Sequence, residues 1–307
     1  MPFHQLKSKR VLVAGGRGFL GRHLIRKLLK TGASVFAPGH DNFEMKNQID
    51  AADLIKGFKP DIIINLAGKV GGITHNILNR GALFYDNILP GIMLLHEAAM
   101  AKVDKFVQIG SVCEYPANCH NPLYEADLWK GYPEWSNAPY GIAKRALLEM
   151  GMAYMEQYGI TVNHVLLANL YGPGDNFTDS GHVIPSMIRK FTSGEKKVVL
   201  FGTGKPTRDF LYVSDAAGAI VRITDEWDSS HPINVSTNKF ISIKHLAEKI
   251  AGMTKYNGKI EWDESKPDGQ IERVVNNSQI CNLGWKPTIG LDDGLRRAIK
   301  WYKANQN

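Results

Sequence analysis

A short apolar strand that runs into a glycine-rich turn constrains the fold of this chain more than any other feature. Residues 10–14 read RVLVA, residues 15–21 read GGRGFLG, and apolar residues at helical spacing follow. Glycines here permit a tight turn and a close approach of the backbone to a phosphate, and the next helix N-terminus supplies N–H donors. In this strand–turn–helix setting the motif predicts a dinucleotide-binding first βα unit. Its candidate cofactor-binding residues are Gly15, Gly16, Arg17, Gly18, Phe19, Leu20 and Gly21.

Apolar strands alternate with amphipathic helices through the first half of the chain. We expect strands over residues 10–14, 33–37, 61–67, 105–109 and 162–167, and helices over residues 20–30, 50–57, 88–102 and 139–158. This alternation is typical of a parallel sheet covered on both faces. The sequence therefore predicts an α/β protein with a Rossmann-type doubly wound parallel sheet.

The second half has the character of a smaller α/β domain. Beyond a loop at 172–181, we expect helices over 182–193, 242–253 and 291–304, strands over 198–201 and 210–213, and a helix capped by Ser214. We also expect the chain to return to the first sheet at least once. Residues 1–170 with about 209–238 are assigned to the cofactor domain, and residues 171–208 with about 239–307 to a C-terminal substrate domain.

The expected second strand bears on the choice of cofactor. An acidic residue at its end would bond the ribose 2′-hydroxyl of NAD. Here the strand runs into Phe36-Ala37-Pro38-Gly39-His40, and Asp41 comes late. Arg17, inside the glycine turn, can meet a 2′-phosphate instead, although a solvated loop charge is the alternative. We therefore favour NADP(H).

Tyr140 and Lys144 stand four residues apart on one expected helix, hence on the same face. A nearby ammonium stabilises tyrosinate, so that the phenol can exchange a proton near neutral pH. Ser111 follows the expected strand at 105–109, where catalytic groups lie in open α/β sheets. Together these three residues predict a site that binds and protonates a carbonyl oxygen.

Composition and charge argue against several other classes of protein. The net charge is +7, but the basic residues are dispersed, which favours a phosphate-bearing small molecule over nucleic acid. Cys113, Cys119 and Cys281 form no CxxC pair and no zinc spacing, so we expect no metal. The odd cysteine count and the lack of a signal peptide predict reduced thiols in the cytoplasm, and no stretch is long enough to span a membrane.

Several further segments give the chain a family resemblance. They are KVGGI at 69–73, GSVCEYP at 110–116, NLYGPGDNF at 169–177, HVIP at 182–185 and KPDG at 266–269. With the glycine turn and the Tyr–Lys pair, they resemble the extended short-chain dehydrogenases/reductases, and in particular the GDP-L-fucose synthase family. The resemblance covers nearly the whole chain, and KVGGI, Ser-x-Cys and HVIP are its most specific parts.

The resemblance implies an enzyme that epimerises C3 and C5 of a GDP-4-keto-6-deoxyhexose and reduces the C4 ketone with NADPH. It implies Cys113 as the base and His182 as the acid, with Ser111 and Tyr140 on the enolate oxygen. It also implies a homodimer through the helices at 88–102 and 139–158. Further implied contacts to the cofactor are Ala67, Lys144, Asn169, Leu170 and His182, and implied contacts to the substrate are Lys190, Phe201, Arg208 and Arg273.

Departures from the family pattern keep other functions open. Val112-Cys113-Glu114 replaces the usual Ser-Cys-Ile, and Phe201 replaces a common tryptophan. The alternatives are a C4-ketoreductase without epimerisation on a related GDP-hexose or heptose, and an NAD-dependent 4-epimerase or dehydratase. A non-catalytic NADP-binding regulator is a further alternative, against which the intact Ser111, Tyr140 and Lys144 set argues.

Overall fold

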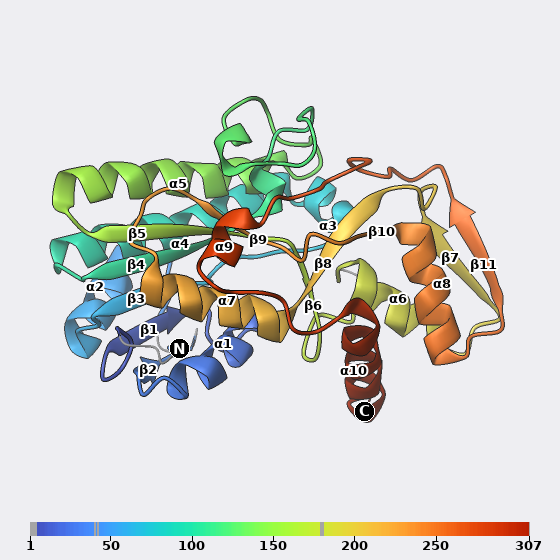
Figure 1. Cartoon of the computed structure of the whole chain (residues 1–307), viewed down its shortest axis with the longest axis horizontal. Helices are drawn as coiled ribbons and strands as arrows, with labels where there is room; N and C mark the ends of the chain where they lie inside the picture. Colours follow the sequence, from blue (N-terminus) through green and yellow to red (C-terminus); the bar gives the residue numbers. More distant parts are fainter. Residues whose placement is uncertain (1–4, 40, 42, 179–180, 307) are drawn as a thin grey trace.

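The computed structural model describes residues 5–39, 41, 43–178 and 181–306. Its central sheet has the strand order β2-β1-β3-β4-β5-β9, and every adjacent pair is parallel (Figure 1). The strands are β1 (Arg10–Ala14), β2 (Ser34–Phe36), β3 (Ile62–Asn65), β4 (Lys105–Ser111), β5 (Thr161–Leu167) and β9 (Ile233–Val235). The predicted Rossmann-type α/β fold is confirmed.

Helices cover both faces of this sheet, with α4 and α5 on one side and α1 and α7 on the other (Figure 1). They are α1 (Phe19–Leu29), α2 (Gln48–Phe58), α4 (Arg80–Met100), α5 (Ala138–Tyr158) and α7 (Val213–Glu226), and a short helix, α3 (Ile73–Leu78), precedes α4 beyond the strand ends. The sequence of β1 explains the two layers. Val11 and Val13 pack into the core under α1 and α7, whereas Leu12 packs into the core under α2 and α4. Both faces of the strand are thus apolar, as a doubly covered parallel strand requires.

A smaller unit stands at one end of the main sheet (Figure 1). It contains β6 (Asn169–Tyr171), β7 (Lys197–Phe201), β8 (Thr207–Tyr212), β10 (Phe240–Ser242) and β11 (Lys259–Asp263), with α6 (Val183–Phe191), α8 (Ile243–Thr254) and α10 (Leu291–Ala304). Its sheets have the orders β10-β8-β6 and β11-β7. Phe191, Phe210 and Leu246 belong to a separate core cluster. The short helix α9 (Ser278–Asn282) belongs to the core of the main sheet, where Ile280 packs. The proposed division into two domains stays a prediction, and the two cores follow it only in part, because it assigned Phe210 to the cofactor domain and Ile280 to the substrate domain.

Two local expectations were wrong. Helix α4 begins at Arg80, eight residues before the expected start, because the polar side chains of Asp86 and Asn87 are buried and interrupt its apolar stripe. Ser214 does not cap α7, since the helix begins at Val213 without a side-chain cap. In that first turn it is Asp215 that accepts hydrogen bonds, from the N–H and hydroxyl of Thr288 at 2.8 and 2.7 Å.

Candidate active site

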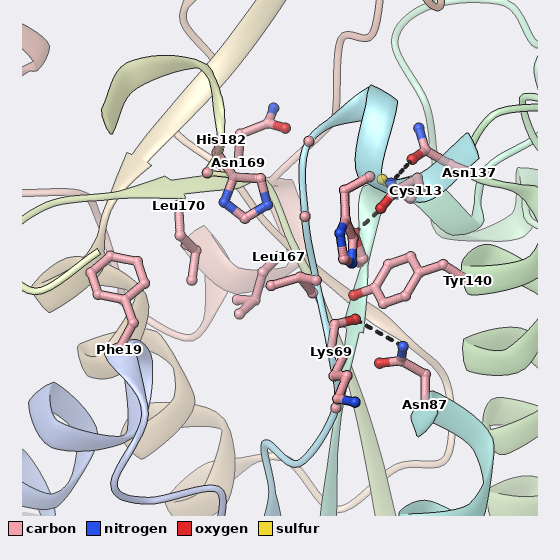
Figure 2. A pocket seen from close by; sticks show the side chains of 18 of the residues that line it. Phe19, Lys69, Asn87, Cys113, Asn137, Tyr140, Leu167, Asn169, Leu170 and His182 are labelled. Carbon is pink, nitrogen blue, oxygen red and sulfur yellow. Dashed lines mark hydrogen bonds between the residues drawn. The ribbon is translucent and has the colours of Figure 1, made fainter. Parts of the chain in front are cut away.

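A cavity of about 1350 Å³ opens where the parallel strands end, between the main sheet and the smaller unit (Figure 2). Ligands of open α/β sheets bind at the carboxyl ends of the strands. The volume exceeds the roughly 300–1,000 Å³ that is usual for a pocket with one small-molecule ligand. The cavity therefore has room for a cofactor and a substrate together. Its wall includes Gly15, Arg17, Gly18, Phe19, Leu20, Gly21, Ala67, Ser111, Cys113, Tyr140, Lys144, Asn169, Leu170, His182, Lys190, Phe201, Arg208 and Arg273. Of the predicted site residues, Gly16 alone is not on this wall as described.

The glycine turn is packed so closely that side chains do not fit. Gly15 has a φ of +74°, and a Cβ there would lie 3.0 Å from the backbone nitrogen of Ala67. A Cβ at Gly21 would lie 2.4 Å from the Gly16 carbonyl oxygen, and one at Gly16 would lie 2.7 Å from Ala37 Cβ. The turn therefore brings bare backbone and the start of α1 to the cavity, which is the arrangement that suits a pyrophosphate.

Arg17 projects from this turn over Gly39. A Cβ at Gly39 would lie 2.2 Å from Arg17 Nη1, so the glycine makes room for the guanidinium. The side chain is 63% exposed, and its nearest carboxylate, Asp41 Oδ2, is 4.0 Å away. His40 lies outside the described residues. A mostly exposed guanidinium at this edge is free to bind a phosphate group.

Helix α5 brings Tyr140 and Lys144 to the cavity on one face, with Lys144 Nζ 5.9 Å from the centre of the Tyr140 ring. Burial raises the pKa of Tyr140, with added repulsion from Cys113 and Glu114, and outweighs a hydrogen bond with Ser111. Burial also lowers the pKa of Lys144 to about 8, against the opposing charge of Glu114. Burial therefore works against the expected effect of Lys144 on the phenol, and that effect stays a prediction.

Cys113 follows Ser111 in a single turn of 3-10 helix after β4. The Cys113 N–H donates to Ser111 Oγ at 3.2 Å, and the Ser111 N–H donates to a carboxylate oxygen of Glu114 at 2.7 Å. Helix α5 passes so close that a Cβ at Gly141 would lie 2.5 Å from the Cys113 carbonyl oxygen. This packing fixes the backbone on which both side chains are mounted.

His182 is the residue that precedes α6, where it makes no side-chain cap. Figure 2 shows its ring on the opposite side of the cavity from Cys113 and Tyr140. Burial lowers the pKa of His182. The arrangement places two groups that can exchange protons on different sides of one space.

The far end of the cavity is basic. Arg208 and Arg273 lie close enough for their charges to repel, and burial together with that repulsion lowers the pKa of Arg208 to about 10. An anion between them would relieve the repulsion. Lys190 donates to the Val199 carbonyl oxygen at 2.7 Å and lies 5.2 Å from the centre of the Phe201 ring. Its amine is therefore engaged with the neighbouring strand.

Several polar residues of the cavity wall were not predicted from the sequence. Asn76 Nδ2 donates to Asn137 Oδ1 at 2.5 Å, and Asn87 Nδ2 donates to the Lys69 carbonyl oxygen at 2.8 Å (Figure 2). Asn87 Oδ1 is buried and has no hydrogen-bond partner among the described residues. The sequence offered one signal for Asn87, which is a single amide side chain among the apolar residues of α4.

No group of three or more His, Cys, Asp or Glu side chains in the described part of the chain has the arrangement of a metal site. No described helix is long and apolar enough to cross a membrane.

Comparisons with known proteins agree with this geometry. The model of the NAD dependent epimerase/dehydratase family matches residues 11–236. GDP-L-fucose synthase 1 of Arabidopsis thaliana is 34% identical over 305 residues, which are 97% of this chain and 94% of that protein. The structure of a GDP-6-OMe-4-keto-L-xylo-heptose reductase from C. jejuni matches with a TM-score of 0.91 at 28% identity, covering 99% of each chain. A GDP-mannoheptose C4 reductase from Campylobacter jejuni with NADP bound matches with a TM-score of 0.87 at 28% identity, covering 98% of this chain and 99% of that one. The chain therefore belongs to the NAD dependent epimerase/dehydratase family, in its GDP-L-fucose synthase-like branch.

Proposed function

We propose that this chain is an NADPH-dependent epimerase/reductase that acts on a GDP-linked 4-keto-6-deoxy sugar, epimerising C3 and C5 and reducing C4. The observation that carries the proposal is the sharing of one cavity by two sets of residues. Ser111, Tyr140 and Lys144 suit a carbonyl oxygen, and Cys113 and His182 approach from opposite sides (Figure 2). The similarity to GDP-L-fucose synthases and to two GDP-heptose reductases supports a GDP-sugar.

The residues around the glycine turn fit NADP(H). Gly15 and Gly18 would cradle the pyrophosphate, because a Cβ at Gly18 would lie 3.2 Å from the Gly15 carbonyl oxygen and fill the space. Arg17 would bind the 2′-phosphate, and Ala67, Asn169 and Leu170 would line the rest of the site with Phe19 and Leu20. When bound, NADPH supplies the hydride for reduction of a ketone.

The polar residues divide the remaining chemistry between them. Protons on C3 and C5 are acidic because they lie next to the ketone, and their removal places negative charge on the C4 oxygen. Ser111 Oγ and the Tyr140 hydroxyl stabilise that charge. Cys113 Sγ takes the proton, and His182 returns one on the other side of the ring. Tyr140, held protonated by burial, finally delivers its proton to the C4 oxygen.

The basic end of the cavity is assigned to the nucleotide diphosphate. Arg208 and Arg273 repel each other there, so a diphosphate between them gains two cations. Phe201, 53% exposed, offers a face on which a base can stack. Lys190 lies beside that ring and completes the proposed substrate site.

We also propose a homodimer formed through α4 and α5. The two helices lie side by side on one face of the sheet (Figure 1). On α4, Tyr85 is 55% exposed and Met100 is 47% exposed, which leaves apolar surface for a second copy. Sedimentation that finds only a monomer at micromolar concentration contradicts this assignment.

Incubation with GDP-4-keto-6-deoxymannose and NADPH in deuterated water tests the function directly. Absorbance follows the cofactor, and NMR locates deuterium in the product. Oxidation with deuterium at both C3 and C5 is the expected result. Oxidation without deuterium identifies a C4-ketoreductase that does not epimerise, and no oxidation with any GDP-linked ketosugar rejects the proposal.

A further inference from the structure

A glutamate lies buried directly behind the turn that carries Ser111 and Cys113. Glu114 is fully buried, and its Oε1 atom accepts the Ser111 N–H at 2.7 Å. The two bonds of this turn, from Ser111 N–H to the carboxylate and from Cys113 N–H to Ser111 Oγ, form a closed capping arrangement. The carboxylate therefore contacts the backbone of the proposed catalytic turn while remaining outside the cavity.

The other carboxylate oxygen is paired with a histidine from β5, fifty positions later in the sequence. His164 Nε2 lies 3.0 Å from Glu114 Oε2, and His164 is 1% exposed. A Cβ at Gly110 would lie 2.4 Å from both Glu114 Oε1 and His164 Nε2. Only a glycine at position 110 leaves room for this pair, so the strand and its buried pair fit each other.

The geometry of the ring indicates the charge of the pair. His164 Nδ1 is buried and has no hydrogen-bond partner among the described residues. A neutral ring that donates its Nε2–H leaves a lone pair on Nδ1 unmatched, whereas an imidazolium would leave an N–H donor unmatched at the same atom. A buried, unmatched donor of a charged group is the costlier of the two. The pair therefore keeps the negative charge of the carboxylate.

Titratable and charged side chains face this carboxylate from each element packed against it. They are His164 from β5, Tyr140, Lys144 and Arg145 from α5, and Cys113 and Tyr115 from its own turn. Arg145 donates to the backbone carbonyl oxygens of Glu114 and Gly131, which hold its guanidinium. Lys144 is buried in the cavity wall, where burial disfavours its charge and Glu114 is the carboxylate that opposes this effect.

We propose that Glu114 is a positioning residue for the reaction, which holds the Ser111–Cys113 turn in place and supplies the negative charge that keeps buried Lys144 an ammonium. The inference rests on the proposed function, because the charge of Lys144 matters for the reaction only if Tyr140 and Lys144 act on the carbonyl oxygen of a ketone. His164 then serves to hold the carboxylate in place, and it does so without cancelling its charge.

A lysine NMR titration tests the charge directly. Lysine labelled with ¹³C at the ε-carbon reports each ammonium, and Lys144→Met identifies the Lys144 signal. We expect a wild-type midpoint near 8. In Glu114→Gln the midpoint falls by about one pH unit, because an ammonium loses the opposite charge beside it. The alkaline limb of NADPH-dependent reduction shifts to lower pH by the same amount.

His164→Gln is the matched control, since it breaks the same pair but leaves the carboxylate. Its Lys144 midpoint is expected to stay within about 0.3 unit of the wild type, as a retained charge requires. An unchanged midpoint in folded Glu114→Gln overturns the proposal. An equal fall in His164→Gln also overturns it, because the effect then comes from disturbed packing.

A second variant decides the matter if Glu114→Gln does not fold. Glu114→Ile combined with His164→Leu replaces the buried pair by apolar side chains, an exchange that is often neutral for stability. The Lys144 midpoint again falls if the charge is what matters, and an unchanged midpoint rejects the role. None of these titrations needs a substrate, so a failure of the wild type to reduce GDP-ketosugars rejects the proposed function separately.

Discussion

The Nη1 atom of Arg273 lies 3.5 Å from the sulfur of Cys113. The other two guanidinium nitrogens, Nε and Nη2, donate to Gln270 Oε1 at 3.0 and 2.9 Å. Gln270 is itself anchored by a bond from its Nε2 atom to the Ala117 carbonyl oxygen at 3.1 Å. The guanidinium is thus aimed at the proposed base, in addition to its proposed contact with the diphosphate.

This contact predicts a selective defect in Arg273→Met. A cation beside sulfur stabilises the anionic form that abstracts a proton, so exchange of the C3 and C5 protons with deuterated water slows by roughly tenfold to 100-fold at saturating substrate. Arg208→Met is the control, since it removes a cation from the same end of the cavity and raises KM for the substrate. Equal exchange rates in the two variants at saturation would contradict a role of Arg273 toward Cys113.

Lys144 predicts the alkaline limit of activity. Its pKa is lowered to about 8 by burial, so the ammonium is present below that pH and is lost above it. We expect kcat for NADPH oxidation to fall as the pH rises from about 7 to 9. In Lys144→Arg the charge persists at every accessible pH, so whatever activity remains should lack this limb. A limb unchanged in Lys144→Arg would assign the titration to another group.

Local pattern in the sequence was enough to predict five of the six strands of the central sheet. The spacing of apolar residues gave β1 at its true bounds, Arg10–Ala14, and placed α5 within one residue, at Ala138–Tyr158. It missed β9 (Ile233–Val235), because three buried residues are too few to show a period. It also began α4 too late, because the buried Asp86 and Asn87 read as surface residues.

The candidate site was predictable only where motifs are contiguous. Ser111, Tyr140 and Lys144 lie within two short motifs, and they line one cavity as expected. The pair of Glu114 and His164 joins the turn after β4 to β5 across 50 positions, a contact that no local pattern contains. The raised pKa of Tyr140 was also out of reach, because it depends on how deeply neighbouring chain segments bury the phenol.

Arg17 predicts a preference for NADPH over NADH. Removing its guanidinium in Arg17→Ala should raise the Kd of NADPH by roughly tenfold, which corresponds to about 1.4 kcal/mol. The Kd of NADH should change by less than about twofold, since NADH has no 2′-phosphate. Fluorescence titration with both cofactors measures the two values. A parallel weakening of both would mean that Arg17 shapes the turn and does not select the cofactor.

We predict that removing the charge of Asp175 stabilises the folded protein, and that the stabilisation depends on pH. Asp175 lies beside Phe19 and His182, its Oδ2 atom is buried, and that atom has no hydrogen-bond partner in the part of the chain described. Burial raises its pKa to about 7, against a hydrogen bond from the Asn176 N–H. The unfolded value is about 3.9. The folded state therefore binds the proton more tightly, and its stability falls as the pH rises from about 4 to 7.

In Asp175→Asn this loss disappears, so the variant should melt above the wild type by roughly 2–4 °C at pH 8 and by less at pH 5. Thermal unfolding monitored by circular dichroism at both pH values measures the difference. Asp41→Asn is the control, because the Asp41 side chain is 90% exposed and its removal leaves Tm nearly unchanged. Only a group that titrates between pH 5 and pH 8 in the folded protein makes the Tm difference between Asp175→Asn and the wild type depend on pH over this range. The same Tm difference at both pH values would therefore show that the pKa of the Asp175 carboxyl is not raised in the folded protein.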